Sequence, residues 1–298
     1  MLEQIHFLLT YTCNYECDHC FLYCSPTAEG TFTISQVEKV LLDAKKINSV
    51  EWIYFEGGEP FLYYPIMLKG LILAKELGFK TGIVTNNYWA TSIEDAKLWL
   101  KPIIDSGIDD LSLSQDSFHQ DDSNVNSAQI ATIAAKKLGY SINTICIEKP
   151  TIQSPSDNKG EPVVGGGALL KGRAAEKLVD GLPTKPVNEF VKCRYEELEE
   201  PSRVHIDSFG NVQVCQGISI GNMWDSPLSQ IIKEYDSANH PICGPIIKGG
   251  PNELANQYGT KLKDSFATEC HYCYTVRRKL IDTFPDQLTP KQVYGIST

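Results

Sequence analysis

Three cysteines near the start of the 298-residue chain are spaced as Cys-x3-Cys-x2-Cys. They are Cys13, Cys17 and Cys20, and they follow an apolar run of strand length at Ile5–Leu9. Cysteine thiolates are the usual ligands of a [4Fe–4S] cluster. Because three thiolates leave one iron of such a cluster without a protein ligand, that iron is free to bind a small molecule. The same spacing also fits a helix face lined by core cysteines, or a zinc knuckle. The polar Asn14 and Asp18-His19 pair are poor material for a buried helical face, so we favour the cluster.

A glycine-rich segment, Glu56-Gly57-Gly58-Glu59-Pro60, directly follows a second strand-like run at Val50–Phe55. Glycines allow a ligand or a second backbone to approach closely. As an isolated turn the segment carries little information. Placed after a strand and downstream of the cysteine motif, it indicates a binding site.

Five further cysteines fall in the last third of the chain, and four of them make a pattern. Cys193 is followed by Gly210-x4-Cys215 and by Cys270-x2-Cys273. Four thiolates suit a closed iron–sulfur cluster or a tetrahedral zinc site, and reduced core cysteines are the remaining alternative. We expect Cys193, Cys215, Cys270 and Cys273 to be the ligands, with Cys243 as the alternative to Cys193.

Strand-like and helix-like segments alternate through the first half of the chain at roughly thirty-residue spacing. Expected strands are Ile5–Leu9, Val50–Phe55, Lys80–Thr85, Asp110–Ser114 and Ser141–Ile147, with a short sixth near Val163; expected helices are Ser35–Ile47, Pro65–Leu77, Ile93–Ser106, Ser123–Leu138 and Ala168–Val179. This alternation predicts a parallel sheet with crossover helices. Segments with candidate metal-ligating or ligand-binding residues follow successive strands. We therefore expect a barrel, whose active site lies at the carboxyl ends of its strands. Val204–Ile206 and Val212–Val214 predict a later hairpin.

Composition narrows the class of protein. No segment approaches the length of a membrane span and no signal sequence is evident, so we expect a cytoplasmic protein. Ten cysteines in that setting favour metal clusters over disulfides. The net charge of −10 disfavours nucleic-acid binding. We expect the two short basic groups, Lys171–Arg173 and Arg277–Lys279, to be solvated edges, with contact to an acidic substrate group as the alternative.

The cysteine motif combined with Gly-Gly-Glu-Pro resembles the radical S-adenosylmethionine (SAM) superfamily. The resemblance implies a partial (β/α)6 TIM-type barrel over residues 1–185. The later cysteines resemble a twitch/SPASM-like domain, over residues 186–298, that holds an auxiliary [4Fe–4S] cluster. The resemblance to the radical SAM superfamily further implies that the first cluster binds SAM and cleaves it reductively to a 5′-deoxyadenosyl radical, which abstracts hydrogen from a substrate.

Roles for individual residues follow from the same resemblance. Gly57, Gly58, Glu59 and Pro60 match the segment that binds the methionyl amino group, and His19 matches a position near adenine. Asn86, Ser112 and Ser114 match strand ends that contact the SAM carboxylate and ribose. An electron donor such as flavodoxin or ferredoxin is implied as a partner.

Cys20–Pro26 and Asp116–His119 resemble peptide-modifying members of the family, especially peptide epimerases, which implies epimerisation or cross-linking of a peptide. In epimerases a thiol next to an auxiliary ligand returns the hydrogen, but Gln216 follows Cys215 here. Cys243 is therefore our candidate hydrogen donor, with Cys24 and Cys146 as alternatives. We also expect no N-terminal peptide-recognition domain, since the first strand begins at once.

The cysteine layout equally resembles 2-deoxy-scyllo-inosamine dehydrogenase. That likeness implies two-electron oxidation of a small alcohol or amine as the alternative reaction. A non-catalytic metal-binding module is a third alternative, but it gives no reason for the glycine-rich segment.

Overall fold

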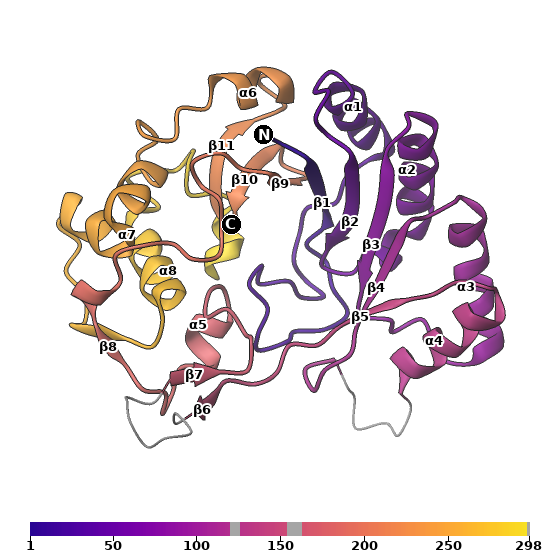
Figure 1. Cartoon of the computed structure of the whole chain (residues 1–298), viewed down its shortest axis with the longest axis horizontal. Coiled ribbons are helices and arrows are strands. Elements are labelled where there is room, and N and C mark those ends of the chain that lie inside the picture. Colours follow the sequence, from indigo (N-terminus) through magenta and orange to yellow (C-terminus); the bar gives the residue numbers. More distant parts are fainter. Residues whose placement is uncertain (120–125, 154–162, 297–298) are drawn as a thin grey trace.

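An eight-stranded sheet forms the centre of the computed structural model, which describes residues 1–119, 126–153 and 163–296 (Figure 1). Its strand order is β11-β10-β9-β1-β2-β3-β4-β5. The strands are β1 (Gln4–Thr10), β2 (Trp52–Gly57), β3 (Lys80–Thr85), β4 (Asp110–Ser114), β5 (Asn143–Ile145), β9 (Arg203–Asp207), β10 (Asn211–Cys215) and β11 (Ile218–Asn222). All neighbours from β9 to β5 pair in parallel, whereas β9, β10 and β11 pair antiparallel. The predicted parallel sheet and the predicted hairpin are thus confirmed.

Four crossover helices connect the parallel strands and lie along one side of the sheet (Figure 1). They are α1 (Ile34–Ala44), α2 (Tyr64–Glu76), α3 (Ile93–Asp105) and α4 (Ser127–Lys137). Thr33, not Ser35, caps α1, because its hydroxyl accepts from the Gln36 amide while the Gln36 side chain accepts from the Thr33 amide. The expected start of the fourth helix at Ser123 lies outside the described residues.

The two faces of the parallel strands differ in chemistry. On β1, Ile5 and Phe7 are fully buried, and the Phe7 ring stacks on Phe55 of β2 at 5.0 Å. Most of the alternate positions are polar, with Leu8 as an exception, and His6 stacks on Tyr54 with ring centroids 4.6 Å apart. Successive strand residues point to opposite faces, so the helix-covered face is apolar and the inner face is polar. A barrel interior packed with aliphatic side chains is therefore not what this chain builds.

The middle of the chain departs from the expected sixth strand–helix unit. Val163–Gly165 is β7, but it pairs antiparallel with β6 (Thr151–Gln153) in a separate two-stranded sheet. The expected helix over Ala168–Val179 is reduced to α5 (Ala174–Lys177). The free edge of β1 is instead covered by β9, which comes from the C-terminal part of the chain.

The C-terminal part adds helices away from the crossover layer (Figure 1). Its elements are α6 (Leu228–Glu234), α7 (Cys243–Gln257), α8 (Glu269–Leu280) and the paired short strands β8 (Lys185–Pro186) and β12 (Ser265–Phe266). Single 3-10 turns occur at Pro60–Tyr63, Val187–Glu189 and Lys291–Tyr294. Because β9–β11 extend the first sheet, the domain boundary at residue 185 stays a prediction. In the described residues, no helix has the length and apolar character needed to cross a membrane.

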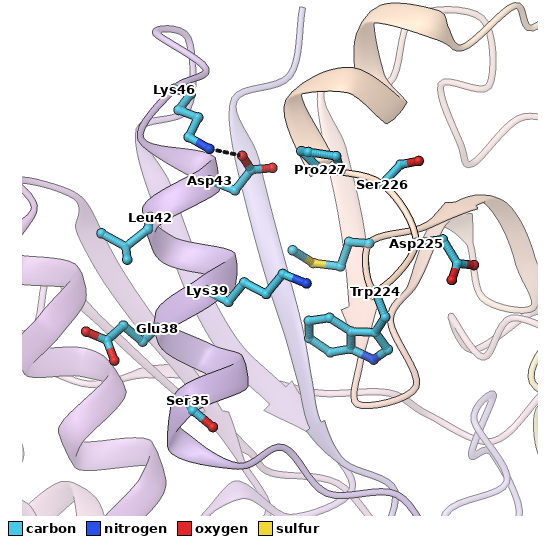
Figure 2. A pocket seen from close by; sticks show the side chains of 11 residues that line it. Ser35, Glu38, Lys39, Leu42, Asp43, Lys46, Trp224, Asp225, Ser226 and Pro227 are labelled. Atoms are coloured by element: carbon cyan, nitrogen blue, oxygen red, sulfur yellow. Dashed lines mark hydrogen bonds and ion pairs between the residues drawn. The ribbon is translucent and has the colours of Figure 1, made fainter.

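The C-terminal part also packs on α1 (Figure 2). The buried Asp43 carboxylate accepts hydrogen bonds from the Ser229 amide at 3.1 Å and from Lys46 Nζ at 2.8 Å. Nearby, Lys39 Nζ lies 5.0 Å from the centre of the Trp224 ring. A pocket of about 440 Å³ opens between these elements, and none of the predicted site residues lines it.

Candidate active site

The three cysteines of the first motif line one cavity of about 220 Å³ at the carboxyl ends of the parallel strands. Cys13, Cys17 and Cys20 belong to the loop that follows β1. Gly57 and Gly58 line the cavity from the end of β2, and further residues come from the ends of β3, β4 and β5. The strand-end placement predicted from the sequence is therefore what the fold produces.

Hydrogen bonds to the sulfur atoms fit metal-bound thiolates. Cys13 Sγ lies 3.4 Å from the Tyr15 amide nitrogen and 3.6 Å from Asn86 Nδ2, both donors. Cys20 Sγ lies 3.4 Å from the Cys24 amide nitrogen. Burial raises the pKa of Cys13 and of Cys17 to about 12, while the hydrogen bond with the Cys24 side chain lowers the pKa of Cys20 to about 6. Cys17 Sγ instead donates to the Phe118 carbonyl at 3.4 Å. Three converging sulfurs, two of them with N–H donors aimed at them, match the ligand set of a [4Fe–4S] cluster.

Arg173 holds this loop in place. Its guanidinium donates to the carbonyl oxygens of Cys17 and Cys24, each at 2.8 Å, and its amide donates to the Cys20 carbonyl at 2.9 Å. The expectation that Lys171–Arg173 is a solvated edge is wrong, because both cations are buried and their charges are used inside the fold. Arg277 of the second basic group is likewise buried.

Glu59 of the glycine-rich segment is fully buried behind the cavity. Its carboxylate accepts from the amides of Phe61 at 3.0 Å and Asn86 at 2.8 Å, and from Thr85 Oγ1 at 2.8 Å. Burial raises the pKa of Glu59 to about 7, although these hydrogen bonds oppose the shift. The structure thus places Glu59 as a residue that positions Asn86, while the backbone of Gly57 and Gly58 borders the cavity.

Gly58 has no room for a side chain. A Cβ atom there would lie 2.1 Å from the Thr12 carbonyl oxygen, which belongs to the backbone of the cysteine loop. We therefore expect Gly58→Ala to displace this loop and to lower the iron content after anaerobic reconstitution to well below that of the parent. Gly139→Ala is the matched control, since a Cβ at Gly139 meets nothing within 4 Å. Equal iron in both variants would contradict the close approach.

The remaining predicted SAM-contacting residues divide into two groups. His19, Asn86 and Ser114 line the cavity. Ser112 does not line it, and its hydroxyl donates to Asp110 Oδ2 at 3.3 Å. Burial lowers the pKa of His19 to about 4, which leaves its ring neutral against Phe118, with ring centroids 4.4 Å apart.

The sequence interpretation left several cavity-lining residues unassigned. They include Tyr15, Glu56, Val84, Thr85 and His119, while Cys24, predicted from the sequence as an alternative hydrogen donor, lines the cavity too. The sequence signal that could have identified these residues is their position at or just after the ends of predicted strands. Glu56, for example, directly precedes Gly57 and Gly58 of the glycine-rich segment. Only the fold shows that these loops converge.

The later cysteines gather in a second place. Burial is the main cause that raises the pKa values of Cys193, Cys270 and Cys273. Electrostatic interactions with neighbouring thiols raise these pKa values further, so the thiols lie close together. Lys171 Nζ lies 3.7 Å from Cys215 Sγ. The second nearby cation, Arg277, donates to the Gln216 carbonyl at 3.0 Å. Four thiolates around a [4Fe–4S] core carry a net charge of about −2, so two buried cations fit such a group.

Cys243 lies on α7 and is fully buried. Burial raises its pKa to about 12, and the thiols of Cys215 and Cys273 are close enough to add to the shift. It is not among the residues that line the cavity of the first motif. Its role as hydrogen donor stays a prediction.

Comparison with known proteins identifies the family. Residues 7–142, which contain the cysteine loop and the glycine-rich segment, match the model of the radical SAM superfamily. Residues 7–142 therefore form a radical SAM domain. The chain is accordingly an enzyme, and this domain implies SAM and a [4Fe–4S] cluster as cofactors.

Individual relatives of this radical SAM enzyme differ in how much of the chain they match. YydG of Bacillus subtilis (strain 168), which is named for peptide biosynthesis, is 24% identical over 247 residues, covering 83% of this chain and 70% of YydG. An S-adenosylmethionine-dependent nucleotide dehydratase of a Thermoplasmatales archaeon is 35% identical over 99 residues, 32% of this chain and 34% of that protein. Among solved structures, BtrN in complex with AdoMet and 2-DOIA aligns with a TM-score of 0.55 and 15% identity, over 90% of this chain and 96% of BtrN. This last likeness confirms the partial-barrel fold.

Proposed function

We propose that this radical SAM enzyme modifies a peptide by abstracting a hydrogen atom from one of its carbon atoms. The observation that carries the proposal is the similarity to YydG, which runs through 83% of the chain and so extends past the family domain. The polar inner face, which includes His6, Tyr54 and Glu56, supports it, because peptide backbone groups need hydrogen-bond partners.

In this proposal Cys13, Cys17 and Cys20 hold the SAM-binding [4Fe–4S] cluster. Gly57 and Gly58 offer backbone groups to the methionyl end of SAM, and His19, Asn86 and Ser114 line the rest of its site. When bound and reduced by a donor such as flavodoxin or ferredoxin, the cluster and SAM together supply a carbon-centred radical. The protein contributes position: Glu59 fixes Asn86, and Arg173 fixes the cysteine loop.

We further propose that Cys193, Cys215, Cys270 and Cys273 hold an auxiliary [4Fe–4S] cluster in a twitch/SPASM-like domain. Buried Arg277 supports this assignment over uncharged core cysteines, as does Lys171, which is paired with Glu196 and also lies 3.7 Å from Cys215 Sγ. Removing such a cation from a low-dielectric site would leave the anionic group uncompensated.

Cross-linking or another oxidative change is the outcome we favour over epimerisation. Within the described residues, Cys24 is the one cavity-lining thiol outside the Cys-x3-Cys-x2-Cys motif. That thiol is hydrogen-bonded to the cluster ligand Cys20, and Cys243 lies elsewhere. A thiol free to return hydrogen to the substrate is thus not evident, and the proposed auxiliary cluster is the better acceptor for the second electron.

Anaerobic turnover in deuterated water tests the proposal, using a short peptide encoded beside the gene as substrate. A product lighter by two hydrogen atoms is expected. Deuterium retained at a substrate carbon would instead establish epimerisation. If 5′-deoxyadenosine forms but candidate peptides stay unchanged while a small alcohol or amine is oxidised, the peptide proposal is wrong and the dehydrogenase alternative holds.

A further inference from the structure

Two histidines and a glutamate meet on the polar inner face of the sheet, apart from either group of cysteines. His205, His6 and Glu56 come from the adjacent strands β9, β1 and β2, and His6 is the direct cross-strand partner of His205. His6 Nδ1 and His205 Nε2 each lie 3.2 Å from the same oxygen, Glu56 Oε1. One nitrogen or oxygen from each residue lies within 4.8 Å of the others. Both histidines are buried, and Glu56 reaches the cavity that the cysteine loop lines.

The neighbours of His6 decide which of its nitrogens carries hydrogen. His6 Nε2 is 3.2 Å from Gln4 Oε1, an acceptor, so the proton belongs on Nε2. The other nitrogen, Nδ1, is buried and makes no hydrogen bond. In the neutral ring, its lone pair therefore faces the Glu56 carboxylate.

His205 is oriented through Gln216. Lys171 Nζ donates to Gln216 Oε1 at 2.6 Å, and Gln216 Nε2 lies 3.3 Å from His205 Nε2. The same His205 nitrogen lies 3.2 Å from Glu56 Oε1. One nitrogen of each imidazole thus faces the same carboxylate oxygen.

A buried carboxylate that faces two imidazoles needs a positive charge beside it, which a proton on an imidazole or a metal ion can supply. Lys171 does not provide it, because that ammonium is paired with Glu196 at 3.1 Å and with Gln216. Two imidazoles and a carboxylate are the donor set that iron, manganese and zinc take in catalytic sites with open positions. Gln4, which orients His6, supplies the kind of supporting hydrogen bond that metal-bound histidines have.

We propose that His6, Glu56 and His205 bind a divalent transition-metal ion. Because Glu56 lines the cavity, the free coordination positions of the ion are open to an oxygen or nitrogen atom of the substrate. A carbonyl or hydroxyl bound there would be polarised beside the site of hydrogen abstraction. The site contains no thiolate, so it is distinct from the iron–sulfur sites and does not depend on the peptide proposal.

Metal content of the anaerobically reconstituted, desalted holoenzyme tests the proposal. A [4Fe–4S] cluster contains iron and sulfide in equal amounts, so a mononuclear ion raises iron above acid-labile sulfide by about one atom per chain. In a separate titration, Mn²⁺ is added to enzyme depleted of loosely bound metal, and free Mn²⁺ is followed by its room-temperature EPR signal. We expect about one Mn²⁺ bound per chain, more weakly at low pH because protons compete for the imidazoles.

Glu56→Gln is the test variant, and Asp110→Asn is its matched control. Asp110 is also an acidic strand residue of the sheet, but its carboxylate accepts from Asn143 Nδ2 at 2.7 Å and from Ser112. We expect Glu56→Gln to remove the excess iron and to weaken Mn²⁺ binding by more than about tenfold, with Asp110→Asn unchanged. Retained cluster absorbance and far-ultraviolet circular dichroism show that Glu56→Gln is folded.

Three results would overturn the proposal. Iron equal to sulfide, together with no Mn²⁺ binding, would mean that the positive charge is a proton. His6, Glu56 and His205 would then form an imidazolium–carboxylate ion pair and no metal site. Equal loss in Glu56→Gln and Asp110→Asn, or no loss in either, would mean adventitious metal only. None of these outcomes bears on SAM cleavage, so the family assignment would stand.

Discussion

Protein in which Cys13, Cys17 and Cys20 are all replaced by alanine is expected to form no 5′-deoxyadenosine from SAM after anaerobic reconstitution and reduction. The reason is that the three thiols line the cavity as the proposed cluster ligands, and alanine offers no metal ligand. Iron bound in clusters should fall by about half, because one of the two proposed [4Fe–4S] clusters is lost. Iron and sulfide analysis with chromatographic detection of 5′-deoxyadenosine measures both effects.

Cys146→Ala is the control for the general effect of removing thiols. Cys146 is exposed and does not line the cavity, so this variant should keep the full iron content and the full rate of SAM cleavage. Undiminished SAM cleavage by the triple variant would contradict the ligand assignment. Zinc in place of iron in the parent protein would contradict it as well.

Local sequence patterns were enough to predict the first half of the fold. The predicted strand Lys80–Thr85 coincides with β3, and Asp110–Ser114 coincides with β4. In this part of the chain, the intrinsic strand and helix propensities, the glycines that end the helices and the spacing of apolar residues all indicate the same elements. The cysteine loop was also predictable, because the residue type and its spacing together carry the chemistry.

The polar inner face was present in the sequence but was not recognised. His6 on β1, like Tyr54 and Glu56 on β2, alternates with buried apolar residues. A strand buried on both faces reads as an unbroken apolar run, and these runs were close enough to that pattern to hide the alternation. Comparing every second residue along each strand would have distinguished the polar inner face of the sheet from the apolar, helix-covered face.

Long-range contacts explain what the sequence did not predict. The pairing of β9 with β1 joins residues about two hundred positions apart, and no local signal specifies it. Burial of Lys171 follows from its pairing with Glu196 and Gln216, which only the completed fold brings together. A charged residue is usually exposed unless it is paired, and the partners were not identifiable in advance.

The fourth ligand of the second cysteine site is the last point on which the structure makes a sharp prediction. Backbone N–H groups of Tyr195 and Glu196 donate to the Cys193 sulfur, as they do to cluster ligands. The Cys243 sulfur is instead hydrogen-bonded to the Tyr235 side chain. These contacts favour Cys193 over Cys243 as the ligand.

We therefore expect Cys193→Ala, made in the Cys13/Cys17/Cys20 triple-alanine background, to lose nearly all remaining cluster iron. Cys243→Ala in the same background should keep it. The background removes the first cluster, so absorbance, iron and sulfide report on the second site alone. Loss of iron in Cys243→Ala with retention in Cys193→Ala would make Cys243 the fourth ligand. Since that sulfur lies on α7, a ligand there would attach the helix to the metal and rule out Cys243 as a free hydrogen donor. Retention in both variants would mean that the second site does not hold an iron–sulfur cluster through either residue.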